Sequence, residues 1–97
     1  MYGLRVSGAK AKKLVASGAI LIDARDAISF RDGTIAGAIN LPLYRVAEMM
    51  RHDRRVSFVV FGDGPQDENA LQITKYLSVY GFSNVYLLDS KVDWDKS

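Results

Sequence analysis

The sequence LIDARDAISFRDGTIAGAINLPL, residues 21–43, decides the fold. Its apolar beginning predicts a buried strand over residues 19–23. A short helix is expected over residues 26–31, ending near Gly33. A turn then leads into a second short strand through Ile39, which Pro42 ends. Two strands separated by a helix are typical of a parallel sheet, because parallel neighbours need a crossover connection.

The segments on either side of this stretch continue the alternation. Ser7 is expected to cap a helix over residues 8–17, which Gly18 ends. After Pro42, residues 44–51 are expected to be helical. Three apolar side chains of that helix are expected to face the core: Val46, Met49 and Met50.

The run VSFVVF, residues 56–61, is the strongest strand in the chain. It is apolar on both faces, as the central strand of a parallel sheet should be. A helix is expected over residues 65–80, ended by Gly81, and a further strand over residues 84–88. The helix has an apolar stripe at helical spacing: Ala70, Ile73, Leu77 and Tyr80. The pattern predicts one small three-layer α/β domain over residues 1–97, with a central parallel sheet flanked by helices.

Composition excludes several classes of function. The 97 residues are 48% hydrophobic and 25% charged, which is typical of a soluble globular domain. A net charge of +2 is too small to indicate nucleic acid or a membrane surface as a partner. The opening residues MYGLRVSGAK lack the apolar segment of a signal peptide, so we expect a cytoplasmic location.

The absence of cysteine excludes disulfides, thiolate metal sites and cysteine nucleophiles together. The one histidine, His52, has no second histidine to join it in a zinc site. We therefore expect no metal, no cofactor and no catalytic residue of the usual kinds.

Residues 21–43 also carry an ordered set of residues that is more specific than their periodicity. These are Asp23, Arg25, Gly33, Ile35, Gly37, Ala38, Ile39, Asn40 and Pro42. The order resembles the first half of a rhodanese-like domain, in which a strand ends in D-x-R and a helix leads to G-H-I-x-G-A-I-N-x-P. In the second half, YGFSNVYLLD resembles the family's helix end and following strand, and Trp94 falls where the family often has a tryptophan.

The resemblance implies a small parallel sheet between helices and an active-site loop after the central strand. Active members of the family carry sulfur as a persulfide on a cysteine that opens a loop of the form C-x-x-G-x-R. Related phosphatases use the same cysteine on phosphate esters. Backbone N–H groups of the loop and the following helix N-terminus hold the anion.

This chain departs from the family at that loop. Counting forward from the central strand places Gly62 at the cysteine position, whereas counting back from Gly81 places Gly64 there. Thr34 stands where the family has histidine, and residues 90–91 replace a glycine pair. The loop consists of Gly62, Asp63, Gly64, Pro65, Gln66, Asp67 and Glu68. Neither register supplies a cysteine, a serine or an arginine, and three carboxylates stand where an anionic substrate would enter.

The acidic loop residues permit more than one interpretation. Asp63 and Gln66 have the spacing of a capping box, with Pro65 in the first helical turn. A cation site and a phosphoacceptor at Asp63, as in receiver domains, remain alternatives. The receiver alternative would also require Asp23, Asp26 and Lys91.

The other charged residues have structural interpretations. Asp23 and Arg25 follow a strand and are expected to anchor loops by hydrogen bonds. The basic segment, residues 51–55, is expected to be a solvated loop, although it could contact an acidic partner. His52 is expected to be exposed, and Lys10, Lys12 and Lys13 to form a solvated helix face.

The sequence therefore predicts a rhodanese-like domain that binds or regulates a protein partner without catalysis, and that binds neither nucleic acid nor membrane. The alternatives are a sulfurtransferase or phosphatase relative with an atypical loop, and a carrier of an oxyanion or small metabolite.

Overall fold

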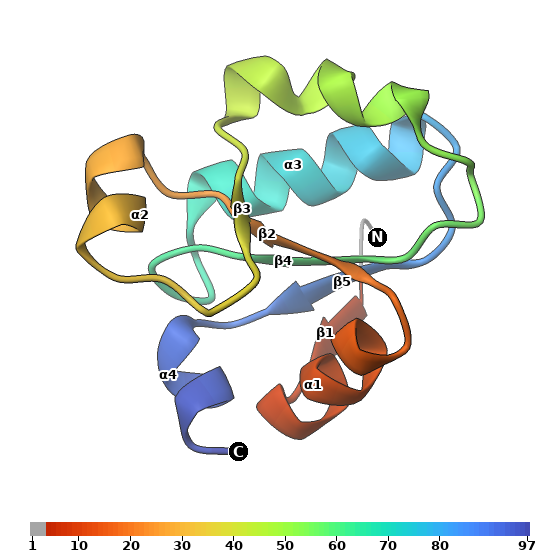
Figure 1. Ribbon diagram of the computed structural model, residues 1–97. Coiled ribbons are helices and arrows are strands. Elements are labelled where there is room, and N and C mark those ends of the chain that lie inside the picture. The colour runs from red at the N-terminus through yellow and green to blue at the C-terminus, as the bar shows by residue number, and fades with distance from the viewer. Residues whose placement is uncertain (1–3) are drawn as a thin grey trace.

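The computed structural model describes residues 4–97 as a five-stranded parallel sheet with helices on both faces (Figure 1). The strands are β1 (Leu4–Val6), β2 (Ile20–Asp23), β3 (Ile39–Asn40), β4 (Phe58–Phe61) and β5 (Val85–Leu88), in the order β1-β5-β4-β2-β3. The helices are α1 (Gly8–Ala16), α2 (Ala27–Asp32), the 3₁₀ helix η1 (Leu43–Arg51), α3 (Glu68–Val79) and α4 (Lys91–Asp95). The predicted α/β class is confirmed. Of the predicted span 1–97, residues 1–3 lie outside the described part.

Strand β4 is the centre of the sheet, as its apolar sequence predicted. It pairs with β2 on one side and with β5 on the other. All four of its residues are fully buried. Phe58 and Val60 pack on the face covered by α3 and η1, whereas Val59 and Phe61 pack on the face covered by α1 and α4 (Figure 1). This alternation explains why the strand is apolar at every position.

The helix before β2 follows its sequence signals. Ser7 caps α1 by accepting a hydrogen bond from the backbone N–H of Lys10 at 3.1 Å. Gly18 adopts a φ of 108° directly after the helix, a conformation that favours glycine. Lys10 and Lys13 are solvated as expected, but Lys12 is half-buried because its ammonium group contacts the carbonyl of Ser97 at 2.7 Å.

Strand β1 was not predicted. It has three residues, of which Leu4 and Arg5 are exposed, so it lacks an apolar pattern. It pairs with β5, about eighty residues further along the chain, with Leu4 opposite Tyr86. The strand forms because β5 offers an unpaired edge, which local sequence cannot reveal.

Two burial predictions before β4 were wrong. The predicted helix over residues 44–51 is present as η1, and Val46 and Met49 are buried, but Met50 is 46% exposed. The tighter 3₁₀ turn places every third residue on one face, which aligns Val46 with Met49 and turns Met50 away. His52 is half-buried rather than exposed, because its ring lies edge-on against Phe58 at 6.1 Å.

Helix α3 begins later than predicted. It was expected from residue 65, but its first residue is Glu68 and its cap is Asp67. Its apolar stripe is as predicted, with Ala70, Ile73 and Leu77 buried. Within residues 4–97, none of the helices is long and apolar enough to span a bilayer.

Candidate functional site

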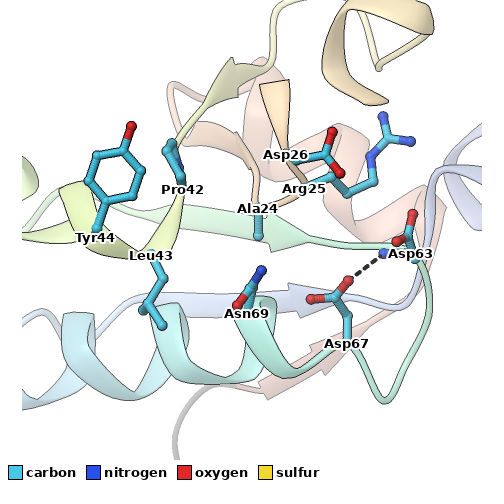
Figure 2. A pocket seen from close by; sticks show the side chains of 9 residues that line it. All are labelled: Ala24, Arg25, Asp26, Pro42, Leu43, Tyr44, Asp63, Asp67 and Asn69. Atoms are coloured by element: carbon cyan, nitrogen blue, oxygen red, sulfur yellow. Dashed lines mark hydrogen bonds between the residues drawn. The ribbon is translucent and has the colours of Figure 1, made fainter. Parts of the chain in front are cut away.

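A pocket lies at the carboxyl edge of the sheet, beyond the ends of β2 and β4 (Figure 2). Ligands of parallel α/β sheets bind at this edge, because the loops that follow the strands gather there. The pocket has a volume of about 480 Å³. It is lined by Ala24, Arg25, Asp26, Pro42, Leu43, Tyr44, Asp63, Asp67 and Asn69.

Asp23, at the end of β2, is the buried anchor beneath this pocket. Its carboxylate is 0% exposed. It accepts hydrogen bonds from the backbone N–H of Arg25 at 2.9 Å, from the Arg25 guanidinium at 2.9 Å and from the Thr34 hydroxyl at 2.7 Å. A buried carboxylate needs such partners to compensate for its lost hydration. Thr34, which stands at the position of the family's histidine, therefore has a structural role as a hydrogen-bond donor to the buried carboxylate of Asp23.

The guanidinium of Arg25 is held by two neighbouring residues. It forms an ion pair with Asp23 and also donates to the carbonyl oxygen of Gly33. The hydrogen bond to Asp23 raises the pKa of Arg25 above its ordinary value, and the charges of Asp63 and Asp26 raise that pKa further. Both of these carboxylates therefore act on the guanidinium. Arg25 is therefore not a free arginine available to bind an anion.

Asn40 ties the strands together at the same edge. Its side-chain amide donates to the carbonyl of Arg25 at 2.7 Å and to the carbonyl of Asp23 at 3.2 Å. Of the other motif residues, Gly37 has a φ of 90° and Pro42 lines the pocket. The motif residues thus fix the loops that form the floor of the pocket.

The loop after β4 is organised by Asp67. One carboxylate oxygen of Asp67 accepts from the N–H of Asp63 at 2.9 Å, and the other accepts from the N–H of Ala70 at 2.9 Å (Figure 2 draws the first). The second contact is the N-cap of α3. The capping box predicted for Asp63 and Gln66 was therefore wrong. A turn from the carbonyl of Gly64 to the N–H of Asp67 occupies those residues instead.

Gly62 and Gly64 are the two candidates for the cysteine position, and they differ in the space available to a side chain. A Cβ added to Gly62 would lie 2.3 Å from Cγ and 2.5 Å from Oδ2 of Asp67. A Cβ added to Gly64 would meet no atom within 4 Å. Any side chain at residue 62 would therefore point into the space that the Asp67 carboxylate fills.

The remaining predicted loop residues lie at the outer side of the loop. Pro65, Gln66 and Glu68 are exposed. The carbonyl of Pro65 accepts from the guanidinium of Arg5 at 2.8 Å, which attaches the loop to β1. Within residues 4–97, no group of three or more His, Cys, Asp or Glu side chains is arranged to hold a metal ion.

The basic segment lies away from the lining of this pocket and has its own contacts. Arg54 donates to the carbonyls of Tyr80, Met50 and His52, and its guanidinium lies 4.7 Å from the ring centroid of Phe82. Arg55 pairs with Asp53 in solvent. Arg54 therefore joins the loop to the end of α3. The prediction of a solvated loop over residues 51–55 holds for only part of the segment.

Sequence reasoning assigned four of the pocket's lining residues to no site: Ala24, Leu43, Tyr44 and Asn69. It considered Asp26 only for the receiver alternative. The local patterns of these residues indicate a cap, a helix start and a helix interior. A usable signal was their position directly after strand ends or at helix starts, where side chains collect at the carboxyl edge of a parallel sheet.

Comparisons with known proteins agree with this architecture. The sequence model of the family described as "Rhodanese-like domain" matches residues 7–94. A thiosulfate sulfurtransferase GlpE of Pseudomonas entomophila (strain L48) is 36% identical over 87 residues, which cover 88% of this chain and 77% of the relative.

Solved structures are similar over nearly the whole chain. The Alr3790 protein of Anabaena sp. superposes with a TM-score of 0.77 at 25% identity, covering 94% of this chain and 76% of that one. The BH2092 protein of Bacillus halodurans has a TM-score of 0.79 at 21% identity, covering 97% and 72%, which supports the fold alone. The family match, the related sequence and the shared fold together show that this chain, which has no cysteine, belongs to the rhodanese-like domain family.

Proposed function

We propose that this rhodanese-like domain is a non-catalytic binding module that recognises a protein partner. The observation that carries the proposal is the position of Asp67. Its carboxylate fills the space in front of residue 62, which is one of the two positions where a side chain opening the family's loop could stand.

Sulfur transfer in the family requires a thiolate that becomes a persulfide. This chain has no cysteine, so no side chain can carry the sulfur between donor and acceptor. The same absence removes the phosphocysteine route of the related phosphatases. The relative named thiosulfate sulfurtransferase is 36% identical to this chain, but sulfur transfer through a persulfide needs a cysteine that this chain lacks.

The loop is also unsuited to an anion. The N–H of Asp63 already donates to an internal carboxylate, and the guanidinium of Arg25 is paired with Asp23. Asp26, Asp63 and Asp67 line the pocket. At ~6 Å and an effective dielectric near 20, each like-charge contact would cost an entering anion about 3 kcal/mol before screening by salt. Thiosulfate and phosphate should therefore bind poorly.

The test combines turnover with binding. The intact chain should form no thiocyanate from thiosulfate and cyanide, under conditions in which the Pseudomonas entomophila relative does. In two-dimensional amide NMR, thiosulfate and phosphate should leave the amides of residues 62–64 and 66–69 unshifted. Thiocyanate formation that Asp63→Asn abolishes would establish an atypical enzyme, and saturable anion shifts at these amides would establish an oxyanion carrier. Either result would overturn the proposal. The cytoplasmic location expected from the sequence stays a prediction.

A further inference from the structure

We propose that the pocket at the carboxyl edge of the sheet is a docking groove for a basic side chain, arginine or lysine, of a partner protein. The inference rests on the proposed function, because it names the chemistry of the partner that a non-catalytic module would recognise. It concerns the groove as a whole: one apolar wall, one exposed aromatic ring and one end of unbalanced negative charge.

The apolar wall comes from the start of η1 and the end of β2. Pro42, Leu43 and Ala24 line it, and Tyr44 stands at its edge with 85% of its surface exposed (Figure 2). An exposed tyrosine beside a groove offers a flat ring at low entropic cost. Arginine and lysine carry long aliphatic stems that cover apolar surface while their charged ends reach elsewhere, and their cations are attracted to aromatic faces.

The opposite end of the groove carries the charge. Asp26, Asp63 and Asp67 line it, and Figure 2 shows Asp63 and Asp67 on the loop facing the β2–α2 turn. Among the described lining residues, Arg25 supplies positive charge, but the buried carboxylate of Asp23 balances it. Four carboxylates and one guanidinium thus leave this end of the groove with a formal net charge of about −3. Asp26 and Asp67 already accept backbone N–H bonds as helix caps, but each carboxylate oxygen can accept more than one hydrogen bond.

The size and shape of the groove favour a side chain over a bare ion. A volume of about 480 Å³ falls in the range of organic ligand sites and far exceeds what one ion needs. The described residues form no group that could hold a metal. Apolar contact along one wall and acidic groups at the end match a cation on an aliphatic stem.

The experiment is an amide NMR titration of the intact chain with four short, end-blocked peptides of otherwise equal sequence. Two contain arginine or lysine, and two contain the neutral analogues citrulline or acetyl-lysine. The charged peptides should produce saturable shifts at residues 24–26, 43–44 and 63–69. Each neutral analogue should bind at least about fivefold more weakly, and the difference should shrink at high salt, because several screened ion pairs are lost together.

Variants then locate the site. Asp63→Asn should weaken binding of the arginine peptide about two- to fivefold, as expected for one exposed ion pair. Tyr44→Ala should weaken it by a similar factor through loss of the aromatic contact. Asp95→Asn is the matched control: it removes the same charge from α4, where Asp95 pairs with Lys91, and should leave affinity unchanged.

Any of four results would overturn the inference. Equal binding of charged and neutral peptides would exclude recognition of the cation. Shifts confined to other residues, or equal effects of Asp63→Asn and Asp95→Asn, would exclude this groove. Saturable shifts with Mg²⁺ alone at the same amides would assign the groove to an ion. These outcomes leave the proposed function intact, since it fails only through turnover or anion binding by the unmodified chain.

Discussion

Replacing Gly62 by alanine should be far more costly than replacing Gly64, although both glycines belong to one loop. An ideal Cβ at residue 62 would lie 2.3–2.6 Å from Cγ, Oδ2 and Cβ of Asp67. Heavy atoms cannot approach so closely, so Asp67 must move. At residue 64 a Cβ meets no atom within 4 Å, and the φ of Gly64 lies outside the left-handed range that disfavours side chains.

The magnitude follows from the contacts that the displaced carboxylate would lose. Asp67 would cease to cap α3 at the N–H of Ala70, a loss of about 0.5–2 kcal/mol. It would also lose the hydrogen bond from the N–H of Asp63, worth roughly 1.5 kcal/mol for a charged acceptor. Gly62→Ala should therefore lower the free energy of unfolding by about 2–4 kcal/mol, or Tm by roughly 10–20 °C. Gly64→Ala should change it by less than about 1 kcal/mol.

Thermal and urea unfolding of the intact chain, followed by circular dichroism, would measure both changes. A double-mutant cycle then isolates the cause. In an Asp67→Gly background, which keeps a residue tolerated at helix caps, Gly62→Ala should cost less than about 1 kcal/mol. Equal effects of the two glycine substitutions would refute the reasoning. So would a cost for Gly62→Ala that persists without the Asp67 side chain.

Three further predictions concern the ion pairs and caps. Asp23→Asn should lower the unfolding free energy by about 2–4 kcal/mol, because it leaves a largely buried guanidinium without its counter-charge, whereas Thr34→Val should cost only about 1 kcal/mol for one hydrogen bond. Arg54→Ala should cost about 2 kcal/mol in urea unfolding, because the guanidinium joins three backbone carbonyls and an aromatic ring, while Arg55→Ala, whose side chain is 91% exposed, should be nearly neutral. The backbone N–H of Ser29 lowers the pKa of Asp26, so the stabilisation by Asp26 is present above the ordinary carboxyl pKa and is lost as pH falls through the folded value. The Tm difference between the native chain and Asp26→Ala should therefore shrink from about pH 7 to about pH 3, and a constant difference would contradict the assignment.

The sequence predicted the parts of the fold that depend on local pattern. Four apolar residues in a row identified β4 as the central strand, because both of its faces need burial. Ser7 and Gly18 marked the limits of α1, because capping and a positive φ act over one turn of chain. The family motif and the absence of cysteine also followed from the sequence, since both are properties of residue order and type.

Several acidic residues precede α3 at positions where each could cap the helix. Local spacing rules favoured Asp63, whereas Asp67 is the cap. The choice of Asp67 over Asp63 depends on the turn at Gly64 and on the closeness of Gly62 to the carboxylate. Strand β1 depends on the edge of β5, far along the chain, and carries no apolar pattern of its own. The cap at Asp67 and strand β1 both depend on tertiary contacts, which the residues adjacent to them in the sequence do not specify.

The pocket was decided by tertiary structure alone. It joins the β2–α2 turn, the start of η1 and the loop after β4. The sequence of each segment places its residues after a strand end or at a helix start, but it does not specify that Tyr44 and Asp63 line the same groove. They meet because parallel strands end at the same edge of the sheet. The ion pair beneath them balances the positive charge of Arg25 against Asp23. Residue types thus determined which chemistry is absent, whereas packing decided which charges remain available to a partner.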